Sequence, residues 1–413
     1  MLQSFSIIFG IAALFSFINY KWLKLPATIG LMILSLGTVL LIILSKGIFP
    51  GFYLFFCDVV VNADFRSLLL DGILSFLLFA GALHVNIEDL KQEKWSVLLF
   101  ATLGVLISSF IVGVLTFGVA RMLSLDLSLV HALLFGALIS PTDPIAVLAI
   151  LKKTKIAKSL QTKIEGESLF NDGVGVVVFA GVLLRSEMSG QAVQSSLGSE
   201  IGTLFLEEAV GGIIYGIVLG FIGHRGIKSV NDNPQLVVLI SLAIVMCGYA
   251  LASLFHVSGP LAMVVSGLYI GNTLNIASNK GAARKMLNEI WEVLDDVFNG
   301  ILFVLIGLAL HLLKFNTGFV FLGLFAIVIV LVARFFSVLL PYSLLKHPKE
   351  SMFKTVTVLT WGGLRGGISI ALALSLAEMG TSDLILFVTY TVVLFSILVQ
   401  GLSIGKLVKT LYK

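Results

Sequence analysis

Two acidic residues, Asp143 and Asp172, lie in separate stretches of the chain that are apolar enough to sit in lipid. An ionisable group at the centre of a bilayer costs about 2.5–3.5 kcal/mol even on the more lenient insertion scale, so it is usually retained for function. Carboxylate oxygens at that depth attract protons and hard cations, which prefer oxygen ligands. The two acids therefore predict an ion-binding site inside a membrane.

The segment around Asp143 is Ser-Pro-Thr-Asp-Pro over residues 140–144. Its two prolines lack the N–H groups that would bind the carbonyls of Ala137 and Ser140, so we expect a helix to break here. The freed carbonyls and the Thr142 hydroxyl would then be oxygen ligands beside the acid. The alternative is a plain proline kink, which does not explain the acid in its middle.

A second polar group follows in the next apolar stretch. Its members are Glu167, Ser168, Asn171 and Asp172, which share one side of a helix at this spacing. Ser168 and Asp172 reach the same point, and Asn171 orders the site through its amide. Glu167 and Ser168 have an alternative role as caps of a helix that begins near 167. Asp172 lies more than a turn deeper, so capping does not explain it.

Two arginines also lie in apolar stretches. Arg334 has no acidic neighbour in sequence, so its counter-ion must come from another span, with Glu167 the favoured partner and Asp143 the second. Arg365 lies in the segment Trp-Gly-Gly-Leu-Arg-Gly-Gly at 361–367, whose glycines weaken helical geometry and allow close helix crossing. This arginine either pairs with an acid or neutralises the carbonyl ends of helices.

Helix rise places these charged groups at one depth. Asp143 lies nine residues before Lys152, and Asp172 lies nine residues after Lys163. At about 1.5 Å per residue, each acid is expected about 13 Å from the same basic face, and the two arginines about 16–18 Å from it. Four charged groups from four spans therefore converge near the middle of a hydrocarbon core of about 30 Å.

The composition is that of a membrane protein. Of the 413 residues, 58% are hydrophobic and 12% are charged, and the mean hydropathy is +1.06, whereas soluble domains carry about 25% charged residues. We expect an all-α integral membrane fold of about 13 transmembrane helices, because the alternating segments of a β-barrel are not visible. The segment 49–62 is a candidate for an additional interfacial helix. The expected spans lie near 3–20, 26–46, 67–87, 95–120, 127–151, 167–184, 203–223, 234–255, 257–273, 289–313, 318–345, 353–377 and 383–405.

Basic residues are distributed unequally between the two sides of these spans. Most of the 27 lysines and arginines fall in the loops after the odd-numbered spans and in the C-terminal tail. By the positive-inside rule that side is cytoplasmic, so we expect the N-terminus outside and the C-terminus inside a plasma membrane, most simply a prokaryotic inner membrane. Topology rather than nucleic-acid binding explains the basic loops, and membrane lipid is the expected surrounding partner.

The polar linkers are too short for a soluble regulatory domain, so a single transmembrane domain over 1–413 is expected. The fifth and twelfth spans are the two with interruptions, and they are seven spans apart. This spacing is expected of two inverted repeats, about 3–184 and 234–405, joined by a linker helix at about 203–223. Transporters with such repeats bind their substrates between the interrupted helices.

These motifs together resemble the electroneutral branch of the monovalent cation–proton antiporters, which includes prokaryotic sodium/proton antiporters related to animal sodium/proton exchangers. The resemblance runs from Leu-Pro-Ala-Thr-Ile-Gly at 25–30 to the glycine-rich segment of the twelfth span. It implies an inverted-repeat fold with a scaffold bundle and a moving core bundle, usually in a homodimer. It also implies that Thr142, Asp143, Ser168 and Asp172 bind the ion, and that Asn171 marks the electroneutral branch.

The charges of the buried layer predict a mechanism. If each arginine neutralises one acid, one negative charge remains among the three acids, and we assign it to Asp172. Either one proton or one monovalent cation (Na+, or else Li+ or K+) can neutralise this charge. Competition at one carboxylate therefore predicts electroneutral 1:1 exchange with alternating access.

Other functions are considered beside this one: a K+/H+ antiporter, a sodium-coupled carrier of an anion bound by Arg365, and a cation channel. No catalytic triad, metal-enzyme spacing or phosphate loop is visible in the sequence, so neither an enzyme nor a cofactor is expected. Asp71, Asp295, Asp296 and Asn299 either line an access funnel or are satisfied polar groups between helices. His84 is either a pH sensor or a hydrogen-bonded surface group.

Overall fold

The computed structural model describes residues 2–51, 53–54, 67–144, 147–148, 158–188, 197–230, 232–276, 281–345, 351–376 and 382–412. Within these ranges the secondary structure is helical, apart from one isolated pair of bridge residues. Among the described helices, nine are long and apolar enough to cross a membrane. The all-α membrane fold expected from the composition is therefore confirmed.

The described part of the first half of the chain is a succession of helices. Its elements are α1 (Leu2–Ile18), η1 (Asn19–Leu23), α2 (Ala27–Ser45), η2 (Leu68–Ile73), α5 (Leu74–His84), α6 (Ile87–Gln92), α7 (Lys94–Leu99), η3 (Phe100–Gly104), α8 (Val105–Met122), α9 (Leu129–Ile139) and α11 (Lys158–Met188).

The described part of the second half is also a succession of helices. Its elements are α12 (Leu197–Ser229), α13 (Pro234–Leu254), α14 (Gly259–Ile276), α15 (Ala282–Leu308), η4 (Ala309–Leu312), α16 (Thr317–Leu344), α17 (Met352–Gly362), α18 (Gly367–Leu374), α19 (Ser382–Phe395), η5 (Ser396–Gln400) and α20 (Gly401–Leu411).

Each expected span overlaps at least one of these helices, while the number thirteen stays a prediction. The fifth and twelfth spans are interrupted as expected, since α9 ends at Ile139 and a gap separates α17 from α18. The sixth span was expected to begin near 167, but α11 begins at Lys158. Glu167 and Ser168 therefore lie inside a helix and do not cap it. Most of the segment 49–62 lies outside the described residues.

Local sequence signals set the starts of α13 and α16. Asn233 accepts a hydrogen bond from the Leu236 N–H at 3.1 Å, and Pro234 occupies the first position of α13. Asn316 accepts from the Gly318 N–H at 2.9 Å at the start of α16. Asparagine caps and a first-turn proline suit these positions because the first N–H groups of a helix have no partner inside it.

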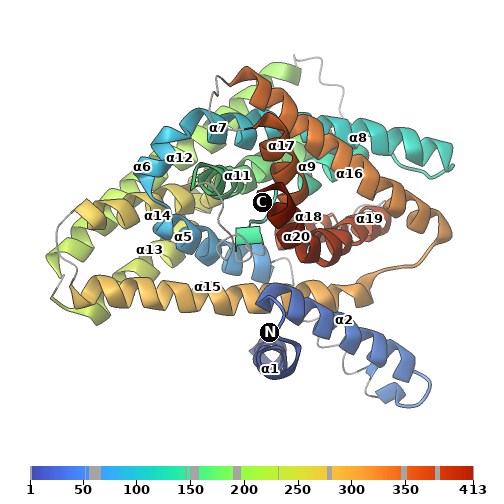
Figure 1. Cartoon of the computed structure of the whole chain (residues 1–413), viewed down its shortest axis with the longest axis horizontal. Coiled ribbons are helices and arrows are strands. Elements are labelled where there is room, and N and C mark those ends of the chain that lie inside the picture. The colour runs from blue at the N-terminus through green and yellow to red at the C-terminus, as the bar shows by residue number, and fades with distance from the viewer. Residues whose placement is uncertain are drawn as a thin grey trace.

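Two groups of helices can be followed in Figure 1. In the first, α12 packs against α13 and α14, α14 packs against α5, and α15 packs against α2 and α5. In the second, α8 packs against α9 and α16, α16 packs against α17 and α19, and α11 packs against α9. We call the first group the scaffold bundle and the second the core bundle. The chain passes from scaffold to core through α6 and again through residues 313–316.

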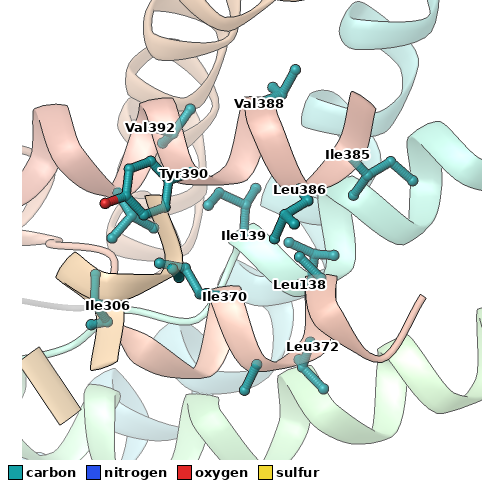
Figure 2. Close-up of a cluster of buried hydrophobic side chains, with 14 of the residues drawn as sticks. Leu138, Ile139, Ile306, Ile370, Leu372, Ile385, Leu386, Val388, Tyr390 and Val392 are labelled. Carbon is teal, nitrogen blue, oxygen red and sulfur yellow. The ribbon is translucent and has the colours of Figure 1, made fainter. Parts of the chain in front are cut away.

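The ends of the broken helices are anchored by apolar packing. Leu138 and Ile139, the last residues of α9, belong to one buried cluster with Ile370 of α18 and Tyr390 of α19 (Figure 2). The Tyr390 hydroxyl donates to the Gly307 carbonyl of α15 at 3.3 Å. This close packing of α9 against α18 and α19 holds the ends of the broken helices in place.

Candidate ion-binding site

The two broken helices meet at their interruptions. The Asp143 N–H donates to the Leu364 carbonyl at 2.8 Å, and these residues form an isolated antiparallel bridge. Non-helical backbone at membrane depth needs such partners, because lipid offers none. The bridge places Asp143 beside the glycine-rich segment of the twelfth span.

Glycine is required where Asp143 approaches that segment. A Cβ atom at Gly366 would lie 2.5 Å from Asp143 Oδ2 and 2.8 Å from Asp143 Cβ. A Cβ atom at Gly363 would lie 2.5 Å from Arg334 Nε. The glycines expected to weaken the helix therefore also make room for two charged side chains.

Two side chains of α11 hold Thr142. Ser168 Oγ donates to the Thr142 carbonyl, and Asn171 Nδ2 donates to Thr142 Oγ1 at 2.8 Å. All three residues are buried, and Asn171 is 0% exposed. Within the described ranges, Asn171 Oδ1 has no hydrogen-bond partner. The structure thus brings these three predicted site residues together. Asn171 contacts Thr142 through its amide and is itself fully buried.

A cavity of about 550 Å³ is lined by residues of both bundles. Thr142, Asp143, Ser168 and Asp172 all contribute to its wall. Asp143 is close enough for its charge to act on Asp172. Among the residues that the structure describes, none forms a hydrogen bond or ion pair with the half-buried Asp172 carboxylate. Four of the predicted ion ligands therefore share one accessible space, and Asp172 has the least local compensation.

Further polar groups reach the cavity from the scaffold bundle. Asp295 and Asp296 of α15 line it, as does His84 of α5. Asn299 Nδ2 donates to Asp295 Oδ1 at 3.1 Å. Asp295 and Asp296 therefore line the cavity, and Asp295 is at the same time hydrogen-bonded by Asn299. The side chain of Asp71 lies outside the described part of the chain.

Glu167 and Arg334 form a buried ion pair. Arg334 Nη1 donates to Glu167 Oε1, and Nη2 donates to Oε2 at 3.0 Å, so the contact is bidentate. The Arg334 side chain is 6% exposed and the Glu167 side chain 2% exposed. Arg334 Nε also donates to the Leu359 carbonyl at 3.3 Å. This is the first of the two pairings expected from the sequence, and it links α11 to α16 and α17.

Arg365 does not pair with an acid through any hydrogen bond in the described residues. Its Nη1 donates to the carbonyl of Ser140 and, at 3.0 Å, to that of Pro141. Of the two roles expected for Arg365, the structure therefore shows the second, because its guanidinium binds the carbonyl end of α9. One carbonyl expected as an ion ligand, that of Ser140, is already occupied. Arg365 is also not among the residues lining the cavity, which removes the basis for an anion carrier.

The depth estimate needs a correction at α11. Lys163, the residue expected to mark the basic face, is 1% exposed, and its Nζ lies 3.6 Å from Glu93 Oε2. Glu93 also accepts from Ser159 Oγ at 2.5 Å. The exposed end of α11 is Lys158, so Asp172 lies 14 residues, or about 21 Å, along the helix from it. The sequence did not reveal this network, because the residues around Lys163 and Glu93 are polar and look the same as those around a charged side chain in a solvent-exposed loop.

Comparison with known proteins gives one consistent result. The family model described as sodium/hydrogen exchanger, transmembrane, matches residues 9–410. The Na(+)/H(+) antiporter NhaP of Pseudomonas aeruginosa is 43% identical over 420 residues, covering 100% of this chain and 97% of that protein. The Na(+)/H(+) antiporter NhaH of Halobacillus dabanensis is 36% identical over 352 residues, covering 84% of each.

A solved structure shares the fold. The sodium proton antiporter MjNhaP1 from Methanocaldococcus jannaschii, determined at pH 8, superposes with a TM-score of 0.77. The match covers 99% of both chains at 22% sequence identity. The helical arrangement described above is therefore that of a known transporter structure.

Proposed function

This chain belongs to the sodium/hydrogen exchanger family and is a sodium/proton antiporter, and we propose that a proton and a cation compete in it for one carboxylate, Asp172. The observation that carries the proposal is the position of this acid. Asp172 lines the cavity beside Thr142, Asp143 and Ser168, and the described residues offer its carboxylate no hydrogen bond or ion pair. A charge at this depth is costly until a proton or cation neutralises it.

The charges of the site support 1:1 exchange. Glu167 and Arg334 cancel each other, which leaves the positive Arg365 and the acids Asp143 and Asp172. The net charge of these three groups is −1 when both acids are ionised, so one proton or one cation makes the loaded site neutral. Thr142 and Ser168 supply further oxygen atoms for a dehydrated cation. The empty site is charged and is expected to cross between the two faces poorly, which couples the two fluxes.

Electroneutral exchange predicts a rate that does not depend on membrane voltage. Moving one net charge through 100 mV changes the free energy by about 2.3 kcal/mol, and 1:1 exchange moves none. We expect sodium-driven proton movement in proteoliposomes to proceed at nearly the same rate with and without a potassium diffusion potential set by valinomycin. A steep dependence on the imposed potential would contradict 1:1 exchange. Repeating the assay with Li+ and K+ determines which cations compete with the proton.

Gly366 provides a test of Asp143 as part of the site. We expect Gly366→Ala to displace the Asp143 carboxylate and to lower exchange by roughly 10- to 100-fold, since small misplacements of reacting groups are costly. Initial rates in proteoliposomes measure the effect. Gly118→Ala is the matched control, because an added Cβ there meets nothing within 4 Å. Full activity of Gly366→Ala would show that the position of Asp143 is not critical.

The protein is a multi-pass membrane protein, and we propose that its C-terminus is cytoplasmic. Lys158 and Asp89 line the cavity where it reaches the surface, on the side of the basic loops. In this orientation the cavity opens to the cytoplasm. A cysteine placed by Lys158→Cys, in a Cys57→Ser/Cys247→Ser background, should react with an impermeant maleimide only from the cytoplasmic side. Labelling from outside would contradict the proposed topology.

The homodimer stays a prediction. The mass of the purified protein in detergent tests it.

A further inference from the structure

Two exposed ion pairs join the connecting segments to the core bundle. Asp89 of α6 binds Lys158, the first described residue of α11, with Oδ2 and Nζ 2.7 Å apart. Lys314, between η4 and α16, binds Asp383 in the first turn of α19, also at 2.7 Å. In each pair the lysine side chain is the more exposed partner, at 74% and 75%. Neither pair belongs to the ion-binding site.

The two pairs occupy matching positions in the chain. Each has one partner in the segment that connects a scaffold helix to a core helix, after α5 in one case and after α15 in the other. Each has its second partner at the start of the core helix that follows a broken helix, α11 after α9 and α19 after α18. The order of charges is reversed, since the acid comes first in one pair and the base first in the other. This correspondence is expected if the two halves of the chain are inverted repeats.

The pairs lie on opposite faces of the molecule. In Figure 1, α6 is at the left of the view and the segment from α15 to α16 is at the right. Asp89 and Lys158 line the cavity at its mouth. Lys314 lies in the segment from α15 to α16, on the side of the view away from α6, and neither it nor Asp383 is among the described residues that line the cavity (Figure 1). The same kind of contact is therefore made at the mouth of the cavity and on the opposite side of the molecule.

We propose that Asp89–Lys158 and Lys314–Asp383 are two matched clamps that stay closed throughout the transport cycle and keep both connecting segments on the core bundle. When a carrier built from inverted repeats changes the face to which it opens, each repeat adopts the conformation that the other had. A contact with the same geometry in both repeats, one at the open face and one at the closed face, is then preserved in both states. A gate, in contrast, would be formed on one face and broken on the other.

If the clamps stay closed, each connecting segment must bend between its clamp and the scaffold bundle. At α6, the Asn272 side chain of α14 accepts from the Ile87 N–H at 2.8 Å and donates to the Val85 carbonyl at 2.9 Å. The start of α6 is thus fixed to the scaffold bundle, while Asp89 is fixed to the core bundle. Movement between the bundles must then be absorbed over the single turn that separates these contacts. On the other face the equivalent point is the turn between η4 and Lys314.

Chemical cross-linking separates a clamp from a gate. In a Cys57→Ser/Cys247→Ser background, the pairs Asp89→Cys/Lys158→Cys and Lys314→Cys/Asp383→Cys are joined by a short bis-methanethiosulfonate that dithiothreitol removes. Since a clamp does not open during the cycle, each cross-linked protein should keep roughly half or more of its sodium/proton exchange rate. Loss of exchange on cross-linking at either face, with recovery after dithiothreitol, would overturn the proposal.

A third pair shows that the reagent arrests movement where movement occurs. Gly81 of α5 and Leu169 of α11 belong to different bundles and contact each other in the cavity wall, since a Cβ at Gly81 would lie 3.8 Å from Leu169 Cδ1. Cross-linked Gly81→Cys/Leu169→Cys should lose exchange and regain it with dithiothreitol. The inference rests on alternating access but not on the role of Asp172, since every pair is compared with its own rate before cross-linking. A failure of the proposed competition at Asp172 would therefore leave this comparison intact.

Discussion

Asp172→Asn is expected to reduce sodium-driven proton movement to the level of protein-free vesicles while leaving the protein folded in the membrane. The amide has nearly the shape of the carboxylate but can neither take up a proton nor neutralise a cation at working pH. The described residues give the Asp172 carboxylate no hydrogen bond or ion pair, so the substitution breaks no such contact there. Dequenching of a trapped pH dye after a sodium pulse measures the rate, and elution of the purified protein as a single species measures folding.

A matched change in the same cavity gives the control for this result. Asp296 lines the cavity from α15, on the scaffold side. Asp296→Asn removes the same charge from the same space, so it should weaken the attraction of cations and raise the apparent KM for sodium, with the maximal rate retained. Normal exchange by Asp172→Asn, or equal loss in both variants, would show that competition does not take place at Asp172.

Much of the site was predictable from residue type and spacing. The prolines of 140–144 and the glycines of 361–367 predicted two broken helices, and the structure has both. The acids in apolar stretches were predicted to lie at one depth in the membrane, because an ionisable group in lipid is costly and is usually retained for function. Thr142, Asp143, Ser168 and Asp172 accordingly line one cavity. In these cases a proline, a glycine cluster or an acid stands out within an apolar helical stretch, and this contrast points to the site.

The partners of the arginines were harder to predict, because they depend on which helices become neighbours. Arg365 binds backbone carbonyls at the end of α9, and a carbonyl group is present at every residue of a chain. The start of α11 was missed because residues 158–166 are polar and resemble a loop, although burial of Lys163 against Glu93 makes them part of the bundle. The bridge from Asp143 to Leu364 likewise joins backbone atoms of distant segments and has no sequence signature.

Separating Glu167 from Arg334 is expected to cost more than any other single change outside the cavity. Either Glu167→Leu or Arg334→Met leaves an uncompensated charge where the present side chains are 2% and 6% exposed. Breaking a buried pair in this way typically destabilises a protein by about 3–5 kcal/mol. Because the pair joins α11 to α16, the loss should appear as poor recovery from the membrane and a lowered thermal unfolding midpoint in detergent.

The double variant Glu167→Leu/Arg334→Met distinguishes a structural role from a transport role. Replacing both charges removes the unpaired partner, and such replacements are often neutral or stabilising by about 1–4 kcal/mol. We expect the double variant to recover most of the folded protein that each single variant loses. Since the pair contributes no net charge to the site, recovered protein should still exchange sodium for protons at a measurable rate. A double variant that unfolds as readily as the single variants would show that the hydrogen bonds of Arg334, including the one to the Leu359 carbonyl, matter more than the balance of charge.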